Sequence, residues 1–207
     1  MPARRRAITR VSRRRRRGGS YRNKWLQYNV LRAKLEWYCQ IKFPQEAGQP
    51  VLAWGAGEND YAPYRTINNI MYATSAGNKL RDMFAYGSIS GIKLEIMPHS
   101  NHHSTGISYQ YPVVVAYLPG VYENQAGATF NEIAALNTSL MLDPLNRQSR
   151  YFSSRGASFD LKITQPDNSL LNGQLIVRAL VNGTVSVSPA WNMKVTLYAY
   201  FRYAKVV

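Results

Sequence analysis

The sequence has a single cysteine and no long apolar run, and each scarcity excludes a class of protein. Cys39 stands alone among 207 residues, which excludes an intrachain disulfide and a cysteine-rich metal site. A membrane-spanning helix needs about 18 consecutive apolar residues, and the sequence contains no such stretch. The charged N-terminus is not followed by the apolar segment of a secretory signal. We therefore expect neither membrane insertion nor secretion.

Acidic residues are also scarce, at 11 against 26 lysines and arginines, and none precedes Glu36. The segment Arg4–Lys24 holds 11 of the basic residues, which leaves 15 basic and 11 acidic side chains in residues 25–207, a net charge of +4. The positive charge therefore belongs mainly to one segment. Paired carboxylates, a Ser-His-Asp set and a phosphate-binding loop do not occur in a recognisable context, so the sequence predicts no enzymatic activity and no cofactor.

The N-terminal segment, residues 1–24, is predicted to be a disordered arm that binds nucleic acid. Its like charges repel one another, and it has too few apolar residues to fold alone. Arginine outnumbers lysine by ten to one, which favours phosphate because a guanidinium group presents a planar fork of donors and also stacks on bases. Full neutralisation by a single strand would give a log–log salt dependence of roughly −8. The predicted nucleic-acid-binding residues are Arg4, Arg5, Arg6, Arg10, Arg13, Arg14, Arg15, Arg16, Arg17, Arg22 and Lys24.

Two other uses of the arm stay open. Five consecutive arginines, Arg13–Arg17, suit an acidic nuclear import receptor, and the arm could also serve only as a solubilising segment. A membrane-surface helix is disfavoured, because Ala7, Ile8 and Val11 are the only apolar residues between positions 4 and 17. Contact with nucleic acid is the favoured interpretation, and nuclear import is compatible with it.

The two ends of the remaining chain predict long strands. Apolar and polar residues alternate from Ala33 to Phe43 and again from Met193 to Tyr203. We expect these two strands to pair, because sandwiches often bring both ends of a chain into one sheet. Cys39 lies on the apolar side of the first strand, which favours a small buried hydrophobic residue over a nucleophile.

Shorter patterns predict further strands in the middle of the chain. Alternation predicts strands at Ile92–Met97 and Phe159–Ile163, and residues 139–142 indicate another short one. A continuous apolar run between two prolines, Val113–Leu118, predicts a strand that is covered on both faces.

Helical spacing occurs only in brief stretches. Short helices or turns are expected at residues 67–71, 80–84 and 130–134, too brief for an α/β protein. Glycine and proline in Pro44–Tyr64 predict a long loop, and Arg147–Arg155 is interpreted as an arginine-bearing loop.

Two Asn-Gly pairs predict tight hairpins. Asn172–Gly173 and Asn182–Gly183 both have the composition of type I′ turns. They predict a meander of three strands, one up to Leu171, one over residues 174–181 and one over Thr184–Ser188.

Three histidines form the one plausible metal constellation in the sequence, namely His99, His102 and His103. Two of them are sequence neighbours, the loop is rich in serine and asparagine, and no carboxylate follows before Glu123. Zinc sites hold three or four ligands in a fixed geometry. A solvated loop is therefore the favoured interpretation, and no metal is predicted.

About eight strands and no long helix predict an all-β fold. Two four-stranded sheets with Greek-key connections, a jelly roll, suit this number and the long loops. The length suits one domain after the arm. The expected organisation is a disordered arginine-rich arm, residues 1–24, followed by a single eight-stranded jelly-roll sandwich, residues 25–207.

Three sets of residues follow the arginine-rich arm in a recognisable order. They are Phe84–Gly87 leading into Ile92–Pro98, then Leu142–Pro144 followed by Ser149–Arg150, and finally Val195–Arg202. In this order they resemble the capsid proteins of circoviruses and related small circular single-stranded DNA viruses. The resemblance covers most of the chain.

The resemblance implies a self-assembling coat protein with one jelly roll per subunit in the smallest icosahedral shell. Its arm would face the interior and neutralise packaged single-stranded DNA. The same arm would bind a host nuclear import receptor, which places the protein in the virion and, during assembly, in the host nucleus. The resemblance does not identify the host attachment receptor.

Two other functions share these features. The coat of a small RNA virus would use the same fold and the same arm, and phosphate contact does not separate DNA from RNA. A non-viral nucleic-acid-binding module with a basic arm should carry basic residues on its folded domain too, whereas residues 25–207 hold a net charge of only +4.

Overall fold

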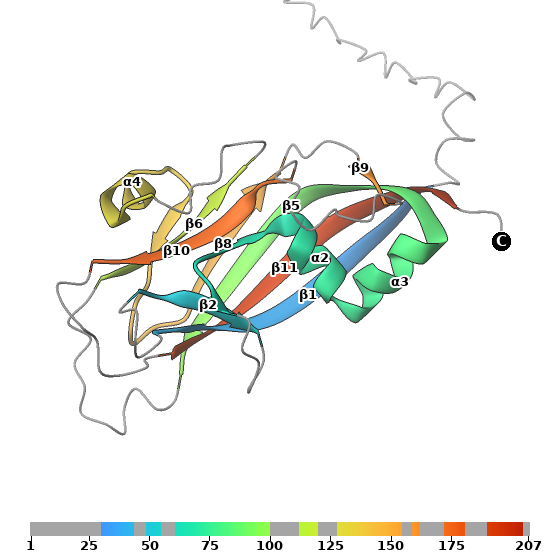
Figure 1. Ribbon diagram of the computed structural model, residues 1–207. Coiled ribbons are helices and arrows are strands. Elements are labelled where there is room, and N and C mark those ends of the chain that lie inside the picture. The colour runs from blue at the N-terminus through green and yellow to red at the C-terminus, as the bar shows by residue number, and fades with distance from the viewer. Residues whose placement is uncertain are drawn as a thin grey trace, which may run out of the picture.

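Strand β1 (Val30–Lys42) has the alternating pattern of buried and exposed residues that the sequence predicts. It pairs antiparallel along its whole length with β11 (Ala190–Ala204), which confirms that the first and last long strands lie side by side. On its other side β11 pairs with β5 (Phe84–Pro98). These three long strands form the centre of the larger sheet in Figure 1.

The computed structural model shows two antiparallel sheets that face each other as the layers of a sandwich (Figure 1). Over the described residues, the strand order is β3-β2-β1-β11-β5-β8 in the large sheet, where β9 also pairs with β5, and β4-β10-β6-β7 in the small sheet. The described residues are 30–43, 49–54, 61–99, 112–119, 128–154, 159–161, 172–180 and 190–204.

The other strands are shorter than the three central ones. They are β2 (Val51–Trp54), β3 (Tyr61–Ala62), β4 (Tyr64–Thr66), β6 (Val113–Leu118), β7 (Ser139–Met141), β8 (Gln148–Ser153), β9 (Phe159–Asp160) and β10 (Gln174–Ala179).

Eight of these strands reproduce the predicted jelly roll. β1, β11, β5 and β8 make one four-stranded layer, and β4, β10, β6 and β7 make the other. The additional strands β2, β3 and β9 are two to four residues long and extend the large sheet. Because β2 and β3 lie within Pro44–Tyr64, the prediction of an uninterrupted loop there is wrong.

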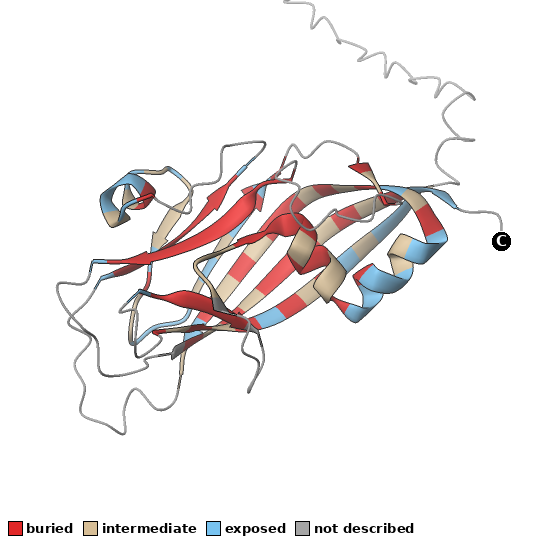
Figure 2. Cartoon of the chain, viewed as in Figure 1, coloured by how far each residue is buried: buried red, intermediate tan, exposed pale blue. Residues whose placement is uncertain are grey.

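The core lies between the two layers, where alternate side chains of both sheets meet (Figure 2). Trp37, Cys39 and Ile41 of β1 are buried there, which confirms the predicted apolar side of this strand. All six residues of β6 are buried, as predicted for a strand covered on both faces. The outer side of β6 is covered by α4 (Phe130–Ala134), which packs Ile133 against it.

Two short helices, α2 (Ile67–Ala73) and α3 (Ser75–Met83), occur where brief helical spacing predicts them. Thr74 joins them, because its Oγ1 accepts a hydrogen bond from the Gly77 backbone N–H at 2.9 Å and donates one to the Met71 carbonyl oxygen at 2.8 Å. One side chain thus caps the end of α2 and the start of α3. No helix in the described ranges is long and apolar enough to cross a membrane.

Two strands differ in extent from their predictions. β5 begins at Phe84, eight residues before the strand predicted at Ile92–Met97. β8 lies within Arg147–Arg155, so the prediction of a loop there is wrong. Its residues are mostly polar because β8 is an outer strand of the jelly-roll layer, and only Phe152 of this strand is buried.

The predicted type I′ turn at Asn172–Gly173 is also wrong. Gly173 has a φ of +85°, but Asn172 does not have the positive φ that a type I′ turn needs at both central residues. β10 follows at once and lies between β4 and β6 rather than within the predicted meander. The second pair, Asn182–Gly183, and the strand predicted at Thr184–Ser188 lie outside the described residues.

Candidate nucleic-acid interface

The eleven residues predicted to bind nucleic acid, all within Arg4–Lys24, lie outside the described residues. The place where the arm joins the fold is nevertheless defined, because β1 begins at Val30 and Val30 lies opposite Arg202 of β11. Lys24 is only six residues before Val30, a length of chain that spans at most about 22 Å. The arm is therefore tethered at this end of the large sheet.

The side chains of the large sheet that point away from the core form a polar surface, called the outward face below. They lie in rows across the strands, and Tyr38, Lys194 and Glu95 occupy one such row on β1, β11 and β5. Among the described residues, this surface carries seven of twelve basic side chains and three acidic ones. They are the basic Arg32, Lys34, Lys42, Lys93, Arg147, Lys194 and Arg202 and the acidic Glu36, Glu95 and Asp160.

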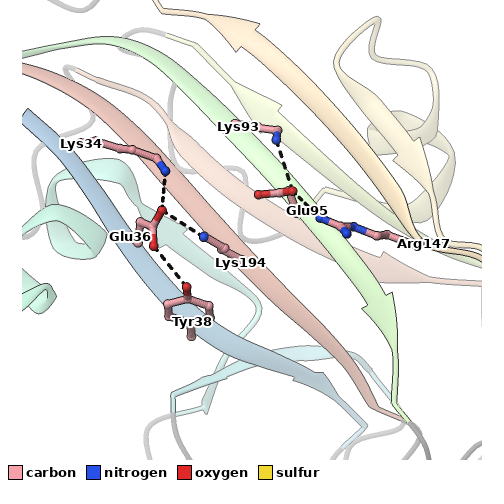
Figure 3. A network of polar contacts seen from close by, with 7 residues as sticks. All are labelled: Lys34, Glu36, Tyr38, Lys93, Glu95, Arg147 and Lys194. Atoms are coloured by element: carbon pink, nitrogen blue, oxygen red, sulfur yellow. Dashed lines mark hydrogen bonds and ion pairs between the residues drawn. The ribbon is translucent and has the colours of Figure 1, made fainter.

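Glu36 is the centre of the first charged cluster on the outward face (Figure 3). Its Oε1 lies 2.6 Å from Lys34 Nζ and 3.0 Å from Lys194 Nζ, and its Oε2 accepts a hydrogen bond from the Tyr38 hydroxyl at 3.2 Å. The bond from Lys34, followed by that from Lys194, lowers the pKa of Glu36 to about 2. Glu36 in turn raises the pKa of both lysines.

Glu95 forms a second cluster of the same kind. Its Oε1 lies 3.2 Å from Lys93 Nζ and 2.6 Å from Arg147 Nη2. These contacts, with Lys93 the larger cause, lower the pKa of Glu95. Each of the two carboxylates is thus shared by two cations, so each cluster keeps one excess positive charge.

Tyrosines stand among these charges on the outward face. Tyr38 and Tyr151 are 61% and 57% exposed. Tyr151 contacts Tyr198 edge to face at 5.8 Å between ring centres, and the guanidinium of Arg32 lies 5.5 Å from the centre of the Tyr200 ring. Cationic groups interleaved with accessible aromatic rings are the two components of surfaces that bind single-stranded nucleic acids.

Two other arginines have structural roles. Arg150 of β8 reaches across to the small sheet, where its Nη2 donates to the Asn137 carbonyl oxygen at 2.7 Å and its Nη1 donates to the Ser139 carbonyl oxygen. Arg178 is buried, its Nε donates to the Ala128 carbonyl oxygen at 2.7 Å, and burial lowers its pKa. Arg150 thus links the two sheets, and Arg178 fixes the segment before α4 to the outer side of the small sheet.

The residues considered as a nucleophile or as metal ligands carry no site in the described structure. Cys39 is buried, as predicted, and burial raises the pKa of its thiol. The described ranges contain no group of three His, Cys, Asp or Glu side chains placed to hold a metal ion. His102 and His103 lie outside these ranges.

The outward face is not predicted from the overall charge of the sequence, although the polar positions of individual strands indicate it. A net charge of +4 over residues 25–207 suggests a nearly neutral body, because the average includes acidic residues that lie elsewhere. When β1 and β11 are considered one strand at a time, most of their polar positions hold a cationic residue or a tyrosine. They are Arg32, Lys34, Glu36, Tyr38, Gln40 and Lys42 on β1, and Asn192, Lys194, Thr196, Tyr198, Tyr200 and Arg202 on β11.

The order of the eight jelly-roll strands defines the class of the fold, which is that of icosahedral viral capsid proteins. No protein-family model and no curated protein sequence matches the chain. The comparison therefore rests on solved structures.

Three solved structures illustrate the likeness, and each covers 86% of this chain. The 60-mer BFDV capsid protein is 14% identical, with a TM-score of 0.52 and 97% of its chain covered. Cocksfoot mottle virus is 8% identical, with a TM-score of 0.59 and 97% coverage. Mud crab tombus-like virus is 9% identical, with a TM-score of 0.58 and 90% coverage. At these identities the likeness shows the fold alone.

Proposed function

We propose that this chain is a viral capsid protein that self-assembles into a small icosahedral shell and packages single-stranded DNA through its arginine-rich arm. The observation that carries the proposal is the jelly-roll sandwich, which matches the 60-mer BFDV capsid protein over nearly the whole of that chain. A segment with 11 basic residues joins this sandwich at one end of the large sheet. The partners are further copies of the chain and the packaged strand.

DNA is favoured over RNA by one observation, the likeness of particular segments. Phe84–Gly87, Ile92–Pro98 and Val195–Arg202 resemble segments of circovirus capsid proteins. A coat protein for RNA is the second candidate, because capsids of small RNA viruses match the fold with TM-scores of 0.58 and 0.59.

The arm also fits a host nuclear import receptor. Five consecutive arginines, Arg13–Arg17, present the dense positive charge that an acidic receptor groove binds. Import would bring the protein to the nucleus before assembly, and packaging would then cover the same residues with nucleic acid.

The proposal is tested by negative-stain electron microscopy of the purified full chain, with the absorbance ratio at 260 and 280 nm recorded before and after nuclease treatment. Uniform closed particles with nuclease-protected nucleic acid are expected. Sequencing of the protected nucleic acid then distinguishes DNA from RNA. A monomer that binds nucleic acid only reversibly would contradict the proposal and favour a basic-armed binding module.

A further inference from the structure

A hollow of about 500 Å³ opens on the outward face of the large sheet. Figure 3 shows Lys194 of β11 between Tyr38 of β1 and Arg147, which lies beyond β5. The volume falls within the range of sites that hold a small ligand, about 300–1,000 Å³. The side chains that bear on its chemistry are Tyr38, Gln40, Glu95, Arg147, Asn192 and Lys194.

One wall of the hollow offers an aromatic ring beside a pair of amides. Tyr38 is 61% exposed, and Lys194 Nζ lies 5.3 Å from the centre of one face of its ring, so a base can stack on the other face. Gln40 Nε2 donates to Asn192 Oδ1 at 3.3 Å, which fixes the two amides side by side on neighbouring strands. That bond uses one amide hydrogen and one carbonyl oxygen, so Gln40 Oε1 can accept from the edge of a base and Asn192 Nδ2 can donate to it.

Each charged cluster contributes one cation to the lining of the hollow. Lys194 shares Glu36 with Lys34, and Arg147 shares Glu95 with Lys93. Two carboxylates against four cations leave two excess positive charges next to the hollow, and the Arg147 side chain is 62% exposed. A group that carries negative charge, such as a phosphate, therefore complements this part of the surface.

We propose that this hollow binds one nucleotide of a single-stranded nucleic acid. The base stacks on the face of the Tyr38 ring that Lys194 leaves open, the edge of the base pairs with the amides of Gln40 and Asn192, and the phosphate contacts the exposed guanidinium group of Arg147 on the side away from Glu95. The inference rests on the proposed packaging function and adds to the arm a second contact site on the folded domain. A single strand is required, because bases must be unstacked from their neighbours to reach an aromatic side chain.

A second copy of the chain fits this surface less well than a nucleic acid. The centres of protein interfaces are depleted in charged residues, whereas the outward face carries seven basic and three acidic side chains among the described residues. The arm is tethered to the same sheet at Val30, eight residues along β1 from Tyr38 or about 26 Å at the rise of a strand, so one strand of nucleic acid can contact both.

Photo-crosslinking of the full chain tests the inference. The probe is a single-stranded oligonucleotide that contains 5-iodouracil, prepared in deoxyribo and ribo forms, and crosslinked tryptic peptides are identified by mass spectrometry. Cleavage after Lys34 and Lys42 isolates the peptide Leu35–Lys42, which contains Tyr38. A crosslink in this peptide is expected, and it should persist in Tyr38→Phe and be lost in Tyr38→Leu.

Binding at different salt concentrations provides an independent measurement. We expect Arg147→Gln to reduce the slope of log affinity against log salt by about 0.7, the value for one phosphate contact with a single strand. Lys79→Gln, which removes the same charge at an exposed position of α3, is the matched control and should leave the slope unchanged. Equal slopes for the two variants would overturn the phosphate contact.

The possible outcomes distinguish failure of the nucleotide site from failure of the proposed packaging function. Crosslinks confined to the arm in a chain that retains nucleic acid would overturn the nucleotide site and leave the packaging function intact. A chain that retains no nucleic acid would overturn both. Loss of particle assembly in Tyr38→Leu, with crosslinks elsewhere unchanged, would assign the outward face to contacts between subunits and would also overturn the nucleotide site.

Discussion

At the scale of single residues, the two shared carboxylates make the outward face sensitive to acid. Glu36 has an ordinary pKa of 4.5, which falls to about 2 in the fold because Lys34 and Lys194 hold its ionised form. A carboxylate of this kind stabilises the fold above its ordinary pKa, and its contribution is lost as the pH falls from 4.5 towards 2. The pKa of Glu95 is lowered as well, so both clusters weaken in the same acidic range.

We expect Glu36→Gln to reduce the acid sensitivity of the fold. Glutamine has no charge to lose, so the free energy of unfolding should fall less between pH 7 and pH 3 in the variant than in the original chain. Denaturant unfolding at the two pH values measures this difference. Asp82→Asn, an equal change of charge at an exposed position of α3, is the control. Identical pH dependence in Glu36→Gln and the original chain would contradict the prediction.

A second prediction at the scale of single residues follows from the burial of Cys39. Its side chain lies in the core, and burial raises the pKa of the thiol, so the reactive thiolate is not formed at neutral or mildly alkaline pH. Ellman's reagent should therefore fail to react with the folded protein at pH 8 and should react with one thiol after unfolding in guanidinium. Rapid reaction in the folded state would show that the core opens at β1.

The sequence predicts some of these residues and not others, for a physical reason. Cys39 is predictable because alternation along one strand places it on the apolar side. Asn172 is not predictable, because its buried side chain donates from Nδ2 to Asn68 Oδ1 at 2.7 Å, a partner 104 residues away. The local sequence of an Asn-Gly pair suggests a type I′ turn. The hydrogen bond to Asn68, which favours a different conformation, exists only in the tertiary fold.

At the scale of elements, the junction between α2 and α3 depends on one hydroxyl group. Thr74 is buried, and its Oγ1 satisfies the Gly77 backbone N–H and the Met71 carbonyl oxygen together. Loss of an N-cap hydroxyl costs about 1 kcal/mol, with a range of roughly 0.5–2 kcal/mol. The junction should therefore be more sensitive to substitution than the exposed positions of α3.

We expect Thr74→Val to lower the free energy of unfolding by about 1–2 kcal/mol, because valine keeps the shape and removes both hydrogen bonds. Thr74→Ser keeps the hydroxyl and should lose much less. Denaturant unfolding of both variants measures the effect. A loss in Thr74→Ser as large as that in Thr74→Val would contradict the prediction, because it would mean that the methyl group, which serine lacks, contributes as much as the two hydrogen bonds.

The elements themselves differ in how far the sequence predicts them. β1, β6 and β11 are predictable because buried strands impose strict alternation or a continuous apolar run. β8 is missed because a strand at the edge of the jelly-roll layer needs few buried side chains. β2 is missed because glycine and proline surround it, and its existence depends on pairing with β1, which gives no local signal.

At the scale of the whole molecule, positive charge occurs in two places with different physical character. The arm carries 11 basic residues and no acidic one, whereas the outward face pairs most of its cations with two glutamates. Among the described residues, the buried side chains lie between positions 35 and 201, outside the arm. Folding and retention of nucleic acid should therefore be separable.

We expect deletion of residues 1–24 to leave a folded chain that still assembles but no longer retains nuclease-protected nucleic acid. Circular dichroism, electron microscopy and the absorbance ratio at 260 and 280 nm measure folding, assembly and retention separately. A variant with lysine in place of the ten arm arginines keeps the charge and is the control, which should still retain nucleic acid. An unfolded deletion variant would show that the arm is part of the folded domain.

The position of β11 also governs when the protein can fold. It is the last strand of the described chain, yet it lies between β1 and β5 in the centre of the large sheet. While the ribosome has not yet released residues 190–204, β1 and β5 have unpaired edges facing a gap, and neighbouring nascent chains can pair with such edges. The large sheet therefore cannot be completed until residues 190–204 have left the ribosome, and the nascent chain needs protection from aggregation until β11 is in place.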